Sequence, residues 1–483
     1  MLPPSFASIL PELCTQFRAS LLADAEGVEF PELLSVEEAV LDFTQQLGKA
    51  LLQQFVTVRA QQALDLRTPC PCGRRKEVLS RRSWPRTTLF GTVSVPDPYT
   101  YCRICHDAER PARAYLGTER ERYSLSLQSA LVDLVSDESA QKAVDKLHRH
   151  HPNVTIDRNV ALRMLHHHGA QARSFVDEKL ERARSEAADG LLPFPPAAEL
   201  EAQYDASLIP VATLEAIPTP AGQEPKRTPV RGLPLRRKNT RWQEAKMGLV
   251  QTPDNTHRLY ALRPTSQLDA AFDDVFGLSC LLGWTPQTAV RGISDGAPYI
   301  HTRLQEVFSL NDFQFILDRP HCKEHLSSAG KALEVHTGIS GSVWAKEALV
   351  MLERGDSDAV VSQLWQAYEA SGDTAETRTD LLRLQAGFFE RNADAVAYGV
   401  YREQGWSTAS SEVESGHRHV VQSRVKISGA WWDPGHVDDI LSLRMLKANG
   451  WWQEYWCAQC EKWKRRAEGF ASSRPPMAVD VAA

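Results

Sequence analysis

Apolar residues recur at helical spacing in two long blocks of the chain. In residues 1–65 the pattern is clearest in "SVEEAVLDFTQQLGKALLQQFVTVRAQQALDL". In residues 326–405 it is carried by "SVWAKEALVMLERGDSDAVVSQLWQAYEA" and "DLLRLQAGFFERNADAVAYGVYREQG". The pattern predicts an N-terminal helical region over 1–65 and a helical insertion over 326–405.

Between these blocks, residues 196–325 alternate between strand-like and helical spacing. Residues 214–240, rich in Pro, Arg and Lys, predict an exposed loop. The chain is therefore expected to be an α/β multidomain protein. The expected elements are strands at Tyr204–Thr213, "WQEAKMGLVQT" and "HRLYALRPT", a helix around 266–283, a strand ending at Asp295, a helix over 299–308 and a strand ending at Asp318.

Residues 121–195 predict a helix-turn-helix DNA-binding region. "LSLQSALVDLVSDESAQKAVDKLHRHH" supplies two helices, and "TIDRNVALRMLHHHG" a third that ends at Gly169. The charged "QARSFVDEKLERARSEAADG" predicts a connecting helix. Periodicity alone fits a plain helical spacer equally well. If the region binds DNA, Arg158, Asn159 and Arg163 are the candidates to face it from the third helix.

Composition places the 483 residues among ordinary globular proteins, with about three domains expected. We expect a soluble, cytoplasmic protein without a membrane partner, because no secretion signal or apolar run of membrane-spanning length is present. The net charge of −6 excludes a uniformly polycationic protein. Basic residues are concentrated in "CGRRKEVLSRRSWPRTT", "KRTPVRGLPLRRKNTRWQEAK" and "CEKWKRRAE", and such runs are more often solvated faces than DNA sites.

Nine cysteines without a secretion signal argue against a disulfide framework. Residues 66–120 predict a zinc ribbon, because two close cysteine pairs flank strand-like sequence and four thiolates satisfy a structural Zn²⁺ ion. Its first knuckle is C-x-C, one residue shorter than the usual C-x-x-C. The expected ligands are Cys70, Cys72, Cys102 and Cys105.

A further pair, Cys457 and Cys460, lies in residues 451–483, which predict a basic C-terminal tail. Two thiolates are half of a zinc site, and a thioredoxin-like context for a redox pair is absent. Packing of the neighbouring tryptophans beside a solvated basic tail is the simpler interpretation, and the role of the pair stays open.

Three carboxylates stand out as candidate ligands for divalent cations. Asp205 lies near the start of the first expected strand, Asp295 ends the fourth, and Glu414 begins a helix after the insertion. Phosphoryl transfer on DNA can use two Mg²⁺ or Mn²⁺ ions, which require about three convergent carboxylates. Asp318 is an alternative to Asp295, although "SDGAPYI" is the better strand-to-loop site, and Glu412 stands close to Glu414.

The order of these motifs resembles that of DDE transposases of the bacterial insertion-sequence type, and is similar to the Kra and Lre groups. The resemblance covers most of residues 65–450. It rests on "CPCG…CRIC…P…YLG", "YDASLIPV", "WQEAKMG", "ISDGAPYI", "FILDRPHCKEHL" and "VESGHRHVVQSRVKISGAWW". It implies an RNase-H-like mixed-sheet catalytic domain, formed by residues 196–325 and 406–450 and interrupted by the helical insertion.

The resemblance also implies an activity, which is metal-dependent cleavage and strand transfer at transposon ends in a bacterial cytoplasm. Asp205, Asp295 and Glu414 would be the catalytic metal ligands, with Asp318 and His321 in an adjacent motif. The implied partners are terminal inverted repeats, target DNA and further copies of the chain. Candidates to contact strand phosphates are Lys246, Arg424 and Lys426, for which ordinary surface charge is an equal alternative.

Two departures from the family pattern keep alternatives open. Asp205 is followed by Ala206 where the family has glycine, and "ASSEVES" replaces a glycine-rich turn. Because a lost turn glycine can shift the backbone, the chain could be a catalytically inactive, transposase-derived DNA-binding protein. An RNase-H-like nuclease is the other alternative.

Overall fold

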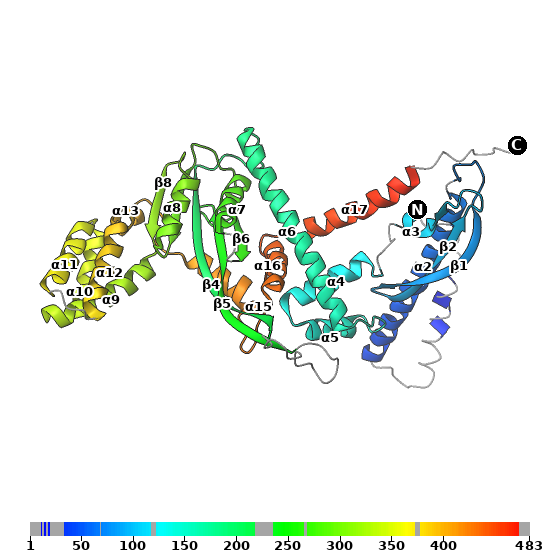
Figure 1. Ribbon diagram of the computed structural model, residues 1–483, viewed down its shortest axis with the longest axis horizontal. Helices are drawn as coiled ribbons and strands as arrows, with labels where there is room; N and C mark the ends of the chain where they lie inside the picture. The colour runs from blue at the N-terminus through cyan, green and yellow to red at the C-terminus, as the bar shows by residue number, and fades with distance from the viewer. Residues whose placement is uncertain are drawn as a thin grey trace, which may run out of the picture. The chain divides into compact units, whose positions relative to one another are not determined.

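The computed structural model describes residues 33–67, 69–116, 122–217, 235–264, 268–371 and 377–472, with five positions between 11 and 19 (Figure 1). It is a mixed α/β protein with two sheets, as expected. The chain divides into two compact units, Met1–Leu165 with Gln453–Ala483, and His166–Trp452. Within the described residues, no helix combines the length and apolarity that a membrane span needs.

The first unit contains a three-stranded antiparallel sheet in the order β1-β2-β3. Helix α2 packs on β2, where Val56 of the helix meets Val93 and Val95 of the strand. Gln53 fixes this contact, because its side-chain amide donates to the Ser94 carbonyl and accepts from the Ser94 N–H, both at 2.7 Å. The elements are α2 (Leu33–Asp65), β1 (Glu77–Thr88), β2 (Gly91–Tyr101) and β3 (Ala108–Glu109).

The helices that follow begin with conventional caps. Ser124 and Ser139 accept hydrogen bonds from the first turns of α4 and α5. The third helix, α6, does not end at Gly169 as predicted but also includes the segment predicted as a separate connecting helix. Glycine serves close packing there, because a Cβ on Gly169 would lie 2.6 Å from Asp439 Cα. The bounds are α3 (Pro111–Tyr115), α4 (Leu125–Asp137), α5 (Ala140–His150), α6 (Arg158–Ala188) and α17 (Trp452–Ser472).

The second unit is built on a five-stranded sheet in the order β6-β5-β4-β7-β8. The central strand β4 pairs antiparallel with β5 and parallel with β7, which pairs parallel with β8. Helix α7 covers one face, where Phe272 stacks on the buried Tyr204 at 4.5 Å between ring centroids. The elements are β4 (Glu199–Ala216), β5 (Arg236–Gln251), β6 (Arg258–Pro264), α7 (Leu268–Leu281), β7 (Ala289–Ser294), α8 (Pro298–Val307) and β8 (Phe313–Leu317).

The predicted order of strands and helices is confirmed, but the predicted loop over 214–240 is wrong at both ends. Strand β4 continues to Ala216 and β5 starts at Arg236, so the two strands pair well into that segment. Cross-strand hydrogen bonding overrides the loop-like composition. Residues 218–234 lie outside the described residues.

Helices α9 to α13 gather beyond the β8 end of the sheet (Figure 1), and the chain then returns to the sheet through three short helical segments. The described residues of 326–405 are therefore mostly helical, as predicted. The bounds are α9 (Arg319–Thr337), α10 (Gly341–Glu353), α11 (Ser357–Ala370), α12 (Thr377–Arg391), η1 (Ala393–Ala395), α13 (Tyr398–Glu403), α14 (Ser411–Gly416), η2 (His417–Gln422), α15 (Ser423–Val425) and α16 (Pro434–Ala448).

Helices α9 and α10 approach each other closely at two facing glycines, Gly330 and Gly341. A Cβ on Gly330 would lie 2.3 Å from the Gly341 carbonyl oxygen. We therefore expect Gly330→Ala to lower the free energy of unfolding by about 1–3 kcal/mol through overpacking. Gly387→Ala is the matched control, because its Cβ would meet only Arg391 Nη1 at 3.5 Å. Urea unfolding of both variants measures the difference, and an equally stable Gly330→Ala variant would contradict this packing.

Candidate functional site: carboxylates at the strand ends

Three aspartates lie level with one another across the parallel half of the second sheet. The last pair between β4 and β7 is Gln203 with Ile293, two residues before Asp205 and Asp295. The last pair between β7 and β8 is Ser294 with Leu317, one residue before Asp295 and Asp318. Extending this register places Asp205, Asp295 and Asp318 side by side, with Asp295 and Asp318 just past the carboxyl ends of β7 and β8 and Asp205 within the longer β4. Polar side chains at that edge of a sheet can act together on one ligand.

Asp295 occupies a tight turn that its own side chain stabilises. Its Oδ1 accepts a hydrogen bond from the Ala297 N–H at 3.0 Å. Gly296 has φ +83, and a Cβ there would lie 2.5 Å from Leu317 Cδ1. The glycine of "SDGAPYI" therefore lets the chain turn sharply against β8 and leaves the half-buried carboxylate at the strand end.

Asp318 is fully buried, and both carboxylate oxygens are hydrogen-bonded. Its Oδ2 accepts from the His321 N–H at 2.9 Å and lies 2.6 Å from His321 Nδ1, so it caps α9. Its Oδ1 accepts from the Ser410 N–H at 2.6 Å. Asp318 therefore connects the end of β8 to the start of α14, 92 residues later.

Glu414 lies on α14 close to this aspartate. The Ser410 hydroxyl donates to Glu414 Oε1 at 3.5 Å, and the buried Gln203 of β4 accepts from the Val413 N–H at 2.9 Å. Ligand atoms of Asp318, His321 and Glu414 all lie within 4.8 Å of one another. Of the three predicted metal ligands, Glu414 belongs to this group, whereas Asp205 and Asp295 do not.

The structure distinguishes Glu414 from its neighbour Glu412. The Glu412 carboxylate forms an ion pair with Arg258 Nη1 at 2.6 Å, which neutralises it. Glu414 forms no ion pair with a lysine or arginine among the described residues, and it lies beside Asp318 and His321. Glu414 is therefore the better candidate for a metal-binding carboxylate, as the motif predicted.

Electrostatics connect Asp205 to the same region. Burial raises the pKa of Asp205 and His417 lowers it. Smaller electrostatic effects come from Asp295, which raises this pKa, and from His321, which lowers it. The hydrogen bond to Asp318 raises the pKa of His321 to about 9. Several carboxylates thus lie in a partly buried site together with the basic His321 imidazole. A divalent cation bound there would relieve the repulsion between the carboxylates.

His417 was not among the predicted site residues. It is buried, with Nε2 3.7 Å from Asp205 Oδ2, and burial lowers the pKa of its imidazole. It begins the π-helical segment η2, a geometry frequent at functional sites. The sequence signal was its position three residues after Glu414, which places it one helical turn further along the chain.

The predicted DNA-contacting residues differ in exposure. Arg158, Asn159 and Arg163 are exposed at the start of α6, and Lys426 is exposed after α15. Lys246 and Arg424 are buried. Lys246 Nζ lies 5.8 Å from the Tyr299 ring centroid, and the Arg424 guanidinium 4.8 Å from that of Trp432.

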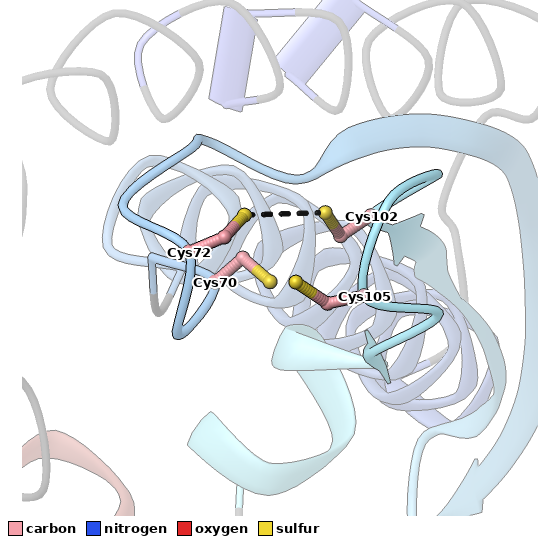
Figure 2. Close-up of side chains that lie close together, drawn as sticks. All are labelled: Cys70, Cys72, Cys102 and Cys105. Atoms are coloured by element: carbon pink, nitrogen blue, oxygen red, sulfur yellow. Dashed lines mark hydrogen bonds between the residues drawn. The ribbon is translucent and has the colours of Figure 1, made fainter.

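The four predicted zinc ligands come together in the first unit. Figure 2 shows the sulfurs of Cys70, Cys72, Cys102 and Cys105 pointing toward one another, with Cys72 and Cys102 3.7 Å apart. All four ligand atoms lie within 4.8 Å of one another. Four thiolates at this separation suit tetrahedral Zn²⁺.

Both knuckles are closed by backbone hydrogen bonds. In the first, the Gly73 N–H donates to the Cys70 carbonyl at 2.8 Å, and in the second the His106 N–H donates to the Cys102 carbonyl at 2.9 Å. Gly73 and His106 both have positive φ. The C-x-C knuckle therefore makes the same kind of turn as C-x-x-C with one residue fewer.

Backbone N–H groups of Cys105 and Ile104 lower the pKa of Cys102 to about 7. This favours the thiolate that binds metal. Cys457 and Cys460, by contrast, are exposed on α17, and no metal-ligand group among the described residues includes them.

We expect Cys102→Ser to lose bound zinc, because three thiolates leave the tetrahedral site incomplete. Cys457→Ser is the matched control and should retain the zinc content of the unaltered protein. Elemental analysis after gel filtration measures the ratio of zinc to chain. Equal zinc in both variants would contradict the assignment.

Asp318→Ala should lower the free energy of unfolding by about 2–6 kcal/mol, since it removes the acceptor of two backbone N–H groups, at about 1–3 kcal/mol for each one left buried. Asp318→Asn keeps an Oδ1 acceptor for Ser410 and should be less destabilised. Urea unfolding distinguishes them. Equal stability of both variants and the unaltered protein would show that the carboxylate does not hold α14.

In comparisons with known proteins, no family model matches this chain, and no curated protein matches it either.

Proposed function

We propose that the chain is a DDE-type DNA transposase that catalyses metal-dependent cleavage and strand transfer at transposon ends. One observation carries the proposal. Two aspartates stand level on adjacent strands, and a helix that returns after a helical insertion brings Glu414 to the same edge of the sheet. Carboxylates at one edge of a sheet offer the kind of ligands that two divalent cations use in phosphoryl transfer.

The topology of the sheet supports the RNase-H-like fold within this proposal. Numbered along the chain, its strands lie in the order 3-2-1-4-5, with the second strand antiparallel to the first. Asp205 lies on the first strand and Asp295 directly follows the fourth. The resemblance noted in the sequence expects the acids at these places.

The chain's own residues would bind and orient the reacting groups. Asp205, Asp295 and Glu414 offer the carboxylate oxygens that Mg²⁺ or Mn²⁺ prefers. When bound, such ions stabilise the attacking and leaving oxygens of an in-line displacement. Asp318 fixes Glu414 through Ser410, and the protonated His321 beside it adds a positive charge at the edge where a phosphate would lie.

The backbone argues against the inactive alternative. Ala206 lies within β4 opposite Lys246, and it is not among the described residues with positive φ. The position therefore needs no glycine. The turn before α14 is likewise held without one, by the hydrogen bond from Ser410 to Asp318.

Incubation of the full-length protein with duplex DNA from the flanks of its gene and Mg²⁺ or Mn²⁺ tests the activity. Nicks at the element's ends and joined strands are expected. Cleavage without joining would favour a simple nuclease, and binding without cleavage would favour the inactive alternative.

Asp205→Asn, Asp295→Asn and Glu414→Gln should each lower metal-dependent end cleavage by at least about 100-fold, since even losing a residue behind a metal ligand costs 10–100-fold. Glu412→Gln is the matched control, because Glu412 is paired with Arg258, and it should stay within a few-fold of the unaltered protein. Cleavage rates at saturating Mn²⁺ provide the measurement. Undiminished cleavage by Asp295→Asn would refute the assigned site.

A further inference from the structure

Strands β4 and β5 extend beyond the rest of their sheet as a two-stranded ribbon, formed by residues 208–216 and 236–244. Their pairing continues without interruption to the last pair, Ala216 with Arg236. Strand β6 pairs with β5 only from Ala245 onward, so no strand among the described residues covers the outer edge of the ribbon. Residues 236–242 of β5 are all exposed.

The ribbon is rich in cations, and they occupy both of its faces. Successive side chains of a strand point to opposite faces, so Arg236 and Lys238 lie on one face and Arg237 and Arg241 on the other. Glu215 and Glu244 are the carboxylates of the same segments. Arg237 approaches Glu215 at 3.9 Å with both side chains well exposed, and such a pair neutralises little of the charge.

Exposed aromatic rings accompany the cations on one face. Trp242 is 55% and Trp431 37% exposed, and their ring centroids lie 6.1 Å apart. Lys238 Nζ lies 5.3 Å from the Trp431 ring centroid. Next to this pair, the backbone carbonyl of Trp432 accepts a hydrogen bond from the Ala212 N–H of β4 at 2.7 Å, which supports the ribbon.

We propose that this ribbon is a DNA-binding arm that enters the major groove of a duplex and contacts phosphates on both of its walls. The major groove is about 12 Å wide and admits a two-stranded ribbon. At about 3.4 Å per residue, the nine-residue segments span roughly 30 Å, close to one turn of duplex. Cations on both faces fit an arm between two phosphate backbones better than one lying flat on DNA.

The inference rests on the proposed function, because it takes DNA as the substrate of the same sheet. Strand β4 carries Asp205 at its centre and continues directly into the ribbon. DNA held by the arm would therefore lie along the strands that lead to the carboxylates. The competing explanation is that the charges only protect an uncovered strand edge from aggregation.

Duplex binding by the full-length protein, measured by fluorescence anisotropy without divalent cations, separates these explanations. The two ribbon variants are Arg236→Ala with Lys238→Ala, and Arg237→Ala with Arg241→Ala. The matched control, Lys346→Ala with Arg354→Ala, removes two exposed cations of the α10 region. Thermal unfolding verifies that all three remain folded.

Each ribbon variant should bind more weakly by about 8-fold for one lost phosphate contact and about 60-fold for two at 0.1 M salt, because log affinity falls with log salt at a slope of about −0.9 per phosphate. The slope itself should decrease in magnitude by about 0.9–1.8. The control should change neither quantity. Ribbon variants that bind like the control would overturn the arm, and increased aggregation with unchanged binding would identify the edge-protection role.

Methyl green, which occupies the major groove, should compete with binding in the unaltered protein more strongly than in the ribbon variants. Equal competition in all proteins would overturn the groove assignment. Asp295→Asn should bind the duplex normally. Loss of binding in the ribbon variants together with normal cleavage by Asp295→Asn would refute the proposed active site but not the arm. Normal binding by the ribbon variants together with loss of cleavage by Asp295→Asn would refute the arm alone.

Discussion

The candidate site depends on one buried carboxylate. Asp318 directly follows β8, caps α9 and accepts a hydrogen bond from the Ser410 N–H, which precedes α14. The chain leaves the sheet here, forms the helices α9 to α13 and returns to the same side chain. Burial of an ionised group is costly unless hydrogen bonds satisfy it, and here backbone N–H groups and the His321 imidazole do so. The position of Glu414 is therefore coupled to β8 by an interaction that tolerates little displacement.

A second buried polar contact fixes α14 from the other side. Gln203 accepts from the Val413 N–H while its own amide donates to Glu201, and Glu201 also accepts from Gln251 of β5. These residues are buried, so a partly satisfied arrangement would cost more than an apolar one. Between Gln203 and Asp318, α14 has one permitted position on the sheet, although it is too short to be stable by itself.

The sequence predicted the elements of the second sheet well, because alternating and helical periods are properties of local sequence. It also predicted the four cysteines, whose spacing directly reflects knuckle geometry. It failed where a distant partner decides the outcome. Gly169 was predicted to end a helix, but it lies within α6, where the absence of a side chain lets Asp439 pack closely against the helix. The sequence placed Asp318 in or beside the site, but it did not predict the hydrogen bond from Ser410 by which Asp318 holds α14, and it did not identify His417, because both depend on contacts that only the folded chain makes.

The error over residues 214–240 is informative because composition and pairing pointed in opposite directions there. Arg, Lys and Pro suggested a loop, yet β4 and β5 pair through Ala216 and Arg236. The cationic start of β5 is exposed, and its outer edge has no partner among the described residues. Burial therefore does not stabilise it, and the folded unit alone does not explain why the strand is so long. The same two strands carry Asp205 and, opposite it, Met247. A ribbon rigidly continuous with those strands would transmit the orientation of bound DNA to the carboxylates with few intervening degrees of freedom, which a flexible basic loop could not do.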